Sequence, residues 1–195
     1  MKIKYLGGSS FLLDFDKKEI LINPSENSKT DVCVITHESE SISSQVEANK
    51  ILDWPGEYET NEVLIEAFEF FREPKDAEKK LGKTLIFTFD FNNQRICHLG
   101  AIGCKLTPEI IDKIGGVDVL IVPIGGENTI DTKKAKEVIS SIDPKVAIPM
   151  NYGGNLASFL KEMGAEGKES IEEIDTKKIK STEDKIEIVV LDESL

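Results

Sequence analysis

The chain has 195 residues, and 39% of them are hydrophobic, which is enough apolar surface for one domain with a sizeable core. Its 36 acidic residues outnumber 24 Lys and Arg residues, so the net charge is -12. An acidic surface repels nucleic-acid phosphates and anionic lipid headgroups, which argues against nucleic-acid and membrane partners. A locally basic pocket is still compatible with this composition.

The three cysteines, Cys33, Cys97 and Cys104, are irregularly spaced and form no CxxC pair. This pattern does not fit a disulfide framework and favours reduced, mostly buried thiols in a cytoplasmic protein. Gly7-Gly8 and Asp14 interrupt the N-terminal apolar pattern, so we expect no signal peptide and no membrane-spanning segment.

Alternating and continuous apolar runs predict several strands in the first half of the chain. They cover residues 2–6, 9–15, 19–23, 31–36 and 61–71. The polar stretch 38–49 is expected to lead into a short helix around 43–50. Residues 72–83 carry many charges and are interpreted as a solvated loop.

The second half predicts alternating strands and helices. Strands are expected at 84–90, 94–99, 117–124, 145–150 and 185–191, and helices at 107–115, 132–142 and 155–163, with an irregular segment at 165–182. Thr107 and Asp131 are typical residues for helix starts. Two stacked sheets with helices outside account for this order.

Several segments, in this order, resemble the metallo-β-lactamase fold superfamily. They are Leu6–Ser9, Asn23-Pro24, Thr36-His37, Ile96–Gly103, Gly116–Gly126 and Pro144–Tyr152. The resemblance implies an α/β (α+β) fold, a four-layered αββα sandwich, over one domain spanning 1–195. The Pro55–Glu59 run is similar to small bacterial members related to the ascorbate-6-phosphate lactonase type.

The same resemblance locates a candidate site in which most of the family's metal ligands are replaced. The family motif Thr-His-x-His-x-Asp-His keeps only His37 here, while Ser39, Ser41 and Ile42 replace its later ligands. The family's His-Leu-Gly-Asp keeps His98 but has Ala101 for Asp, and Asn151 stands where a last His is expected. Asn23 likewise occupies a frequent Asp position. The resemblance therefore implies a vestigial site at one sheet edge: His37, Ser39, Ser41, His98, Ala101 and Asn151.

A two-metal site of this type needs about seven protein ligands, and this chain contains only two histidines. Without metal, no bound water reaches a pKa near ~7 to act as the nucleophile. We therefore expect no metal cofactor and a binding or assembly role, with a small molecule or a protein as partner. Self-association is left open.

Two alternatives assign an enzymatic role. A zinc site rebuilt around His37 and His98 would hydrolyse a small phosphorylated or lactone substrate. A metal-free enzyme would instead use the two histidines with Ser39, Ser41 and Asn151 in acid–base work.

Purely structural roles are also expected for several of these residues. The two histidines are expected to hydrogen-bond to Ser39, Ser41 or Asn151. Trp54 and Tyr58 are expected to pack at the edge of the sandwich. Gly125-Gly126 is expected to form a tight turn, since no phosphate-loop spacing surrounds it.

Overall fold

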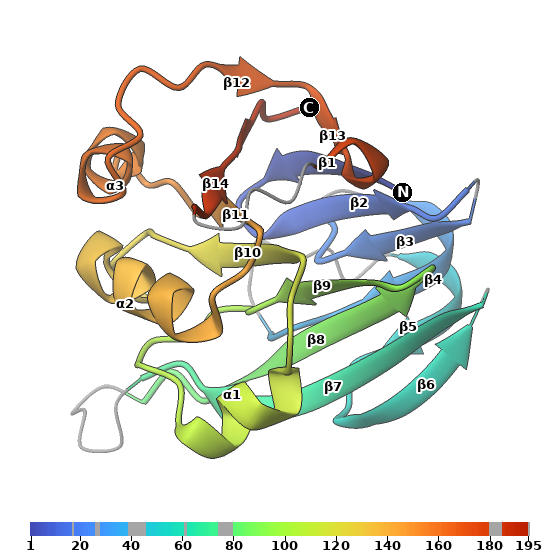
Figure 1. Cartoon of the computed structure of the whole chain (residues 1–195). Coiled ribbons are helices and arrows are strands. Elements are labelled where there is room, and N and C mark those ends of the chain that lie inside the picture. The colour runs from blue at the N-terminus through green and yellow to red at the C-terminus, as the bar shows by residue number, and fades with distance from the viewer. Residues whose placement is uncertain are drawn as a thin grey trace.

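The computed structural model describes residues 1–16, 18–25, 28–38, 46–60, 62–73, 80–179 and 185–194. Most of its strands belong to two sheets (Figure 1). Sheet A contains β1 (Lys2–Gly7), β2 (Ser10–Asp14), β3 (Glu19–Ile22), β4 (Lys29–Val34), β5 (Glu47–Leu52) and β13 (Glu173–Asp175), in the order β13-β1-β2-β3-β4-β5. Sheet B contains β6 (Gly56–Thr60), β7 (Val63–Phe71), β8 (Lys83–Phe91), β9 (Gln94–His98), β10 (Val119–Pro123), β11 (Val146–Met150) and β14 (Glu187–Ile188), in the order β14-β11-β10-β9-β8-β7-β6.

Strand directions bring several loops to one edge of the molecule. In sheet A, β3 pairs with β4 in parallel, so both strands end at the same side. In sheet B, β9, β10 and β11 are parallel to one another, and their C-terminal ends lie together. A backbone hydrogen bond from the Leu85 N–H to the Thr36 carbonyl, 2.7 Å, joins the end of β4 to β8 in the other sheet. The edges of the two sheets are therefore connected where the site residues lie.

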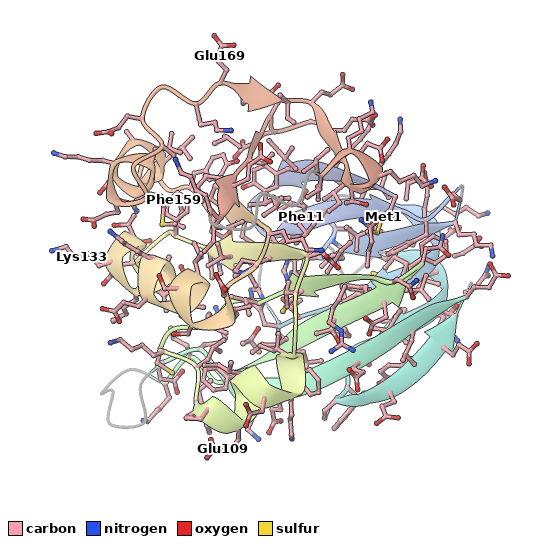
Figure 2. The ribbon with its side chains drawn as sticks, in the orientation of Figure 1. Met1, Phe11, Glu109, Lys133, Phe159 and Glu169 are labelled. Atoms are coloured by element: carbon pink, nitrogen blue, oxygen red, sulfur yellow. The ribbon has the colours of Figure 1, made fainter. Side chains whose placement is uncertain are left out.

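The main core fills the space between the two sheets. In β1, Ile3 and Tyr5 are buried while Lys2 is exposed, as the two-residue period of a strand dictates. Phe11 belongs to the same core, and Figure 2 shows it inside the molecule while Glu109, Lys133 and Glu169 project outward.

The α-helices cover the outer face of sheet B. These are α1 (Pro108–Ile114), α2 (Thr132–Ile142) and α3 (Leu156–Glu162), and they bury Ile114, Ile139 and Phe159 against strands of that sheet (Figure 1). Asp131 caps α2 as predicted, because its carboxylate accepts a hydrogen bond from the Lys134 N–H. The predicted α/β fold with two stacked sheets is confirmed. Among the described residues no α-helix covers the outer face of sheet A. The helix layer expected on that side of the αββα sandwich is therefore not seen in the described part of the chain.

Three sequence predictions differ from the structure. Residues 47–52 form strand β5 along β4 and not the end of a short helix; residues 43–45 lie outside the described residues. The segment 165–182, expected to be irregular, contributes β12 (Ser170–Ile171), β13 and the 3₁₀ turn Thr176–Lys178. The expected strand 185–191 is split into β14 and β15 (Val190–Leu191). In each case backbone pairing with a distant strand decides the conformation, which local composition does not reveal.

Two further residues test the packing expectations. The Trp54 side chain is 72% exposed and does not pack at the sandwich edge, whereas Tyr58 is half-buried against the core and donates its hydroxyl to the Trp54 carbonyl. No helix among the described residues is long and apolar enough to cross a membrane.

Candidate functional site

The loops at the joined sheet edges line a cavity of about 360 Å³. It is lined by the β1–β2 turn (Gly8, Ser9), the ends of β4, β7 and β9 (His37, Arg72, Ala101), the loop after β10 (Gly125, Glu127, Asn128, Thr129), the loop after β11 (Asn151, Tyr152, Gly153), and Tyr5 and Glu193. This is where the carboxyl ends of parallel strands meet, a common position for ligand sites in α/β proteins.

A chain of hydrogen bonds runs from Asn23 through Thr36 to His37. The Thr36 N–H donates to Asn23 Oδ1 at 2.8 Å, which fixes the orientation of the Asn23 amide. Asn23 Nδ2 therefore donates to Thr36 Oγ1, also at 2.8 Å. Thr36 Oγ1 lies 2.8 Å from His37 Nδ1, and its hydroxyl hydrogen has no other acceptor among the described residues. The Thr36 hydroxyl thus donates to Nδ1, and the proton of a neutral His37 ring lies on Nε2.

His37 is neutral at physiological pH. Burial lowers the pKa of its imidazole to about 4, and the nearby positive charge of Arg72 acts in the same direction. Its Nε2 has no hydrogen-bond partner among the described residues. His37 consequently offers one N–H donor to the cavity.

His98 is fully buried beneath the cavity, and both ring nitrogens are used by the backbone. The Gly100 N–H donates to Nδ1 at 3.0 Å, so the ring proton is on Nε2, which donates to the Ser9 carbonyl at 3.2 Å. Burial lowers the pKa of His98 to about 3. The ring also makes an edge contact with Phe11. His98 therefore holds the β1–β2 turn against the end of β9.

Ala101 and Asn151, where the resemblance led us to expect replaced ligands, both line the cavity, but they make different contacts. Ala101 is buried and its N–H donates to Thr84 Oγ1 at 2.9 Å. Asn151 has a left-handed backbone, φ 54°, and its N–H donates to the Gly8 carbonyl at 2.9 Å. A Cβ atom on Gly125 would lie 2.8 Å from the Asn151 carbonyl oxygen, so Gly125 is required for close backbone contact.

Four of the six residues named from the sequence thus lie in or directly under one cavity. His37, Ala101 and Asn151 line it, and His98 lies below it. Ser39 and Ser41 lie outside the described residues. The histidines were expected to bond to those serines or to Asn151; within the described residues their partners are instead Thr36 for His37, and Ser9 and Gly100 for His98.

Sequence reasoning missed Arg72, which it assigned to a solvated loop. Arg72 follows β7 directly and lines the cavity. Its Nη1 donates to the carbonyls of Glu38 and Leu81 at 3.5 and 3.3 Å, while its Nε is buried without a partner. The composition already drew attention to this residue, because arginine is rare in the chain and occurs only at Arg72 and Arg95.

Acidic and phenolic groups belong to another part of the cavity. Glu193 follows β15, and the Ser194 N–H donates to the Tyr5 carbonyl. Burial, followed by the neighbouring Tyr152 and the carboxylate of Glu193, raises the pKa of Tyr5. Burial likewise raises the pKa of Tyr152 to about 12. Glu193 thus acts on the tyrosines, whereas Arg72 acts on His37.

Comparison with known proteins places this geometry in a family. Residues 2–151 match the model of a beta-lactamase superfamily domain. The chain belongs to the metallo-β-lactamase superfamily. A crystal structure from Thermotoga maritima, described as a candidate zinc-dependent hydrolase of this superfamily, has a TM-score of 0.80, is 31% identical in sequence, and covers 97% of each chain.

Curated relatives are UPF0173 proteins. One from Pyrococcus furiosus is 26% identical over 78% of this chain and 84% of its own length. One from Caldivirga maquilingensis, named a UPF0173 metal-dependent hydrolase, is 24% identical over 77% of this chain and 81% of its own. The superfamily name thus implies a metal centre, which the donor atoms of this chain allow us to test.

The described residues do not fit a metal centre of the metallo-β-lactamase kind. A zinc ion needs about three or four side-chain donors that converge on it. His98 has no free ring nitrogen, Ala101 has no donor atom, and Asn151 offers only a neutral amide. Within the described residues, no three His, Cys, Asp or Glu side chains come together in a possible cation site. His37 Nε2 is the one imidazole nitrogen without a hydrogen-bond partner among the described residues, so it alone is available to a ligand in the cavity.

Proposed function

We propose that this chain is a metallo-β-lactamase-fold protein that binds a small molecule in its edge cavity without a metal ion and does not carry out metal-dependent hydrolysis. The observation that carries the proposal is the double engagement of the His98 ring by Gly100 and Ser9. Ligation of a metal would require breaking one of these buried hydrogen bonds, which costs about 1–3 kcal/mol per unpaired group.

The chemistry of the cavity supports binding over metal-free acid–base catalysis. A general base works best with a pKa near the working pH, and the His37 pKa of about 4 makes it a weak base at neutral pH. The buried thiols are also poor nucleophiles, because burial raises the pKa of Cys33 to about 11 and raises that of Cys97 as well.

A thermal melt tests this proposal. Purified protein should give the same melting temperature in buffer, in excess EDTA and in excess zinc, because no metal contributes to the folded state. A lower melting temperature in EDTA, recovered by adding zinc, would contradict it.

The second candidate is a metal-dependent hydrolase acting on a small phosphorylated or lactone substrate, in the manner of the ascorbate-6-phosphate lactonase type. The names of the relatives favour it, and so does His37, whose Nε2 is unpaired among the described residues. Zinc-dependent turnover of a sugar lactone or a phosphodiester, lost in His37→Ala, would establish it. Absence of zinc binding by calorimetry would exclude it.

A further inference from the structure

We infer that the cavity binds the oxyanion end of a small hydroxylated molecule, held between the guanidinium of Arg72 and the Nε2–H of His37. The inference rests on the proposed metal-free function and names the ligand class for that site. It is carried by two observations: the unfilled donor edge of Arg72 and the hydrogen-bond chain that sets the His37 tautomer.

The two arginines of the chain differ in what they hold. Arg95 presents Nε and Nη2 to the two carboxylate oxygens of Asp90, at 2.8 and 2.6 Å, and its Nη1 donates to the Ile114 carbonyl. This paired arrangement is the usual way in which arginine binds a carboxylate or phosphate. Arg95 therefore shows what a satisfied guanidinium looks like in this fold.

Arg72 also donates Nη1 to backbone carbonyls, but within the described residues no carboxylate is hydrogen-bonded to it, and the neighbouring Glu73 acts on it only through its charge. Its Nε is buried without a partner, and no hydrogen bond within the described residues uses its Nη2. Buried polar groups are nearly always paired in native proteins, so an unpaired buried Nε indicates a missing partner. Arg72 lines the cavity beside His37, where a bound oxyanion would accept hydrogen bonds from this guanidinium.

Asn23 makes His37 a donor toward the same oxyanion. Toward Thr36 Oγ1 the Asn23 side chain can act only as a donor, because Oδ1 already accepts from the Thr36 N–H; the same amide nitrogen also donates to Ser9 Oγ at 3.0 Å. The Thr36 hydroxyl then donates to His37 Nδ1, which leaves Nε2 protonated. An Asp at position 23 would reverse every step: it would accept from the Thr36 hydroxyl, Thr36 would accept from Nδ1–H, and Nε2 would present a lone pair. Asn23 thus selects anion binding by His37 over metal ligation.

The remaining lining residues indicate which groups the ligand carries away from its oxyanion. The carboxylate of Glu193 raises the pKa of Tyr5 and Tyr152 and does not act on His37, so this part of the cavity can accept hydrogen bonds from ligand hydroxyls but repels an anion. A molecule with an anionic group at one end and hydroxyl donors at the other matches this division of charge. Sugar acids and sugar phosphates have this chemistry, and they share the oxyanion.

Calorimetric titration of EDTA-treated protein tests the ligand class. Inorganic phosphate and gluconate are the two oxyanion probes, and glucose is the neutral polyol control. We expect binding of at least one oxyanion and none of glucose; the stronger probe identifies a phosphate or a carboxylate as the preferred group. Binding of glucose as tight as gluconate, or no binding of either oxyanion, would overturn the inference.

Variants locate the binding. Arg72→Gln should weaken oxyanion affinity about tenfold or more, the usual effect of losing a charge-assisted hydrogen bond. Arg72→Lys should lose only part of the oxyanion affinity, since lysine keeps the charge but cannot present two parallel N–H donors. Lys161→Gln, which removes one exposed charge on α3, is the matched control and should change the affinity less than twofold. Equal losses in Arg72→Gln and Lys161→Gln would contradict the assignment.

The tautomer of His37 is measured independently of any ligand. With only two histidines, two-bond ¹H–¹⁵N spectra of the imidazoles resolve both rings. In the native protein both should carry the proton on Nε2. In Asn23→Asp, His37 should change to the Nδ1–H form and lose oxyanion affinity, while His98 stays unchanged. Thr36→Val should also release the His37 tautomer without adding charge. A native His37 protonated on Nδ1 would overturn the role of Asn23.

The outcomes separate the two proposals. If metal-free protein binds neither phosphate nor gluconate, the ligand class is wrong while the metal-free function stands. If the purified protein instead requires zinc for stability, the proposed function is wrong whatever the anion titrations give.

Discussion

The Gly100 N–H donates to Nδ1 of His98 at 3.0 Å, and this one contact fixes how the buried ring is used. It forces the ring proton onto Nε2, which then holds the Ser9 carbonyl of the β1–β2 turn. A residue that the superfamily resemblance identifies as a retained ligand therefore works here as a clamp between the two sheets. Its removal should affect folding more than ligand binding.

The two histidines should make stability fall on mild acidification. Burial sets the folded pKa of His98 at about 3 and that of His37 at about 4, both below the ordinary value near 6.5. Below about pH 6.5 the unfolded chain binds protons that the folded chain does not, so stability present at pH 7 is lost as the pH falls toward 4. With both rings contributing, the slope approaches about 2.7 kcal/mol per pH unit. Urea unfolding between pH 7 and 5 measures it.

His98→Gln provides the control for that titration. The variant should be less stable at pH 7, yet its dependence on pH between 6.5 and 5 should be about half that of the native chain, since one titrating ring is gone. An unchanged slope would show that His98 is not buried in its neutral form.

Gly103→Ala should destabilise the fold severely. A Cβ atom at position 103 would lie 1.6 Å from the Arg72 carbonyl oxygen, so the backbone of one segment must move. We expect a loss of more than about 3 kcal/mol in unfolding free energy. Gly116→Ala is the matched control, because its Cβ would meet nothing within 4 Å, and it should change stability by less than about 0.5 kcal/mol. Similar losses in both variants would contradict the close packing of Gly103 on Arg72.

Thr84 connects the two sheets under the cavity, and its hydroxyl should be required for stability. Thr84 Oγ1 donates to the Thr36 carbonyl at 3.2 Å and accepts from the Ala101 N–H at 2.9 Å. Thr84→Val keeps the shape but leaves the buried Ala101 N–H without its partner, at a cost of about 1–3 kcal/mol, while the Thr36 carbonyl still accepts from the Leu85 N–H. Thr88→Val, which loses one 3.4 Å contact to the partly exposed Glu66, should cost less. Thermal or urea unfolding of Thr84→Val and Thr88→Val, compared with the native chain, measures the two losses of stability.

The sequence predicted much of this arrangement, and particular residues show why the rest was hidden. Alternation in Lys2–Leu6 and the apolar run at Val32–Ile35 mark strands locally, and Asp131 marks a helix start. Strand β5 is specified by its pairing with β4, and β13 by its pairing with β1, neither of which local composition encodes. At the site, the resemblance located His37, Ala101 and Asn151. The tautomers of His37 and His98 depend on Thr36, Ser9 and Gly100, which become visible only once the chain is folded.

Restoring the family's ligands should make stability depend on metal. The combined replacements Ser39→His, Ser41→Asp, Ile42→His, Ala101→Asp and Asn151→His return the donors that the superfamily motifs contain. A metal that binds only the folded state adds about 2.7 kcal/mol at a hundredfold excess over its Kd. Zinc should then raise the melting temperature of this variant, and EDTA should reverse the rise. No response to zinc would show that metal binding needs changes beyond these five positions. Adding Asn23→Asp to the variant then tests the contribution of the His37 tautomer.

The metal content of the native protein decides whether the cavity works without a metal ion. Protein produced in a culture supplemented with zinc, iron and manganese, and purified without chelator, is analysed by inductively coupled plasma mass spectrometry. If the cavity binds its ligand without a metal, each of the three elements will be well below one ion per chain, and His37→Ala will not change the values. About one ion per chain, lost on mutating His37, would contradict the account and favour a metal-dependent hydrolase.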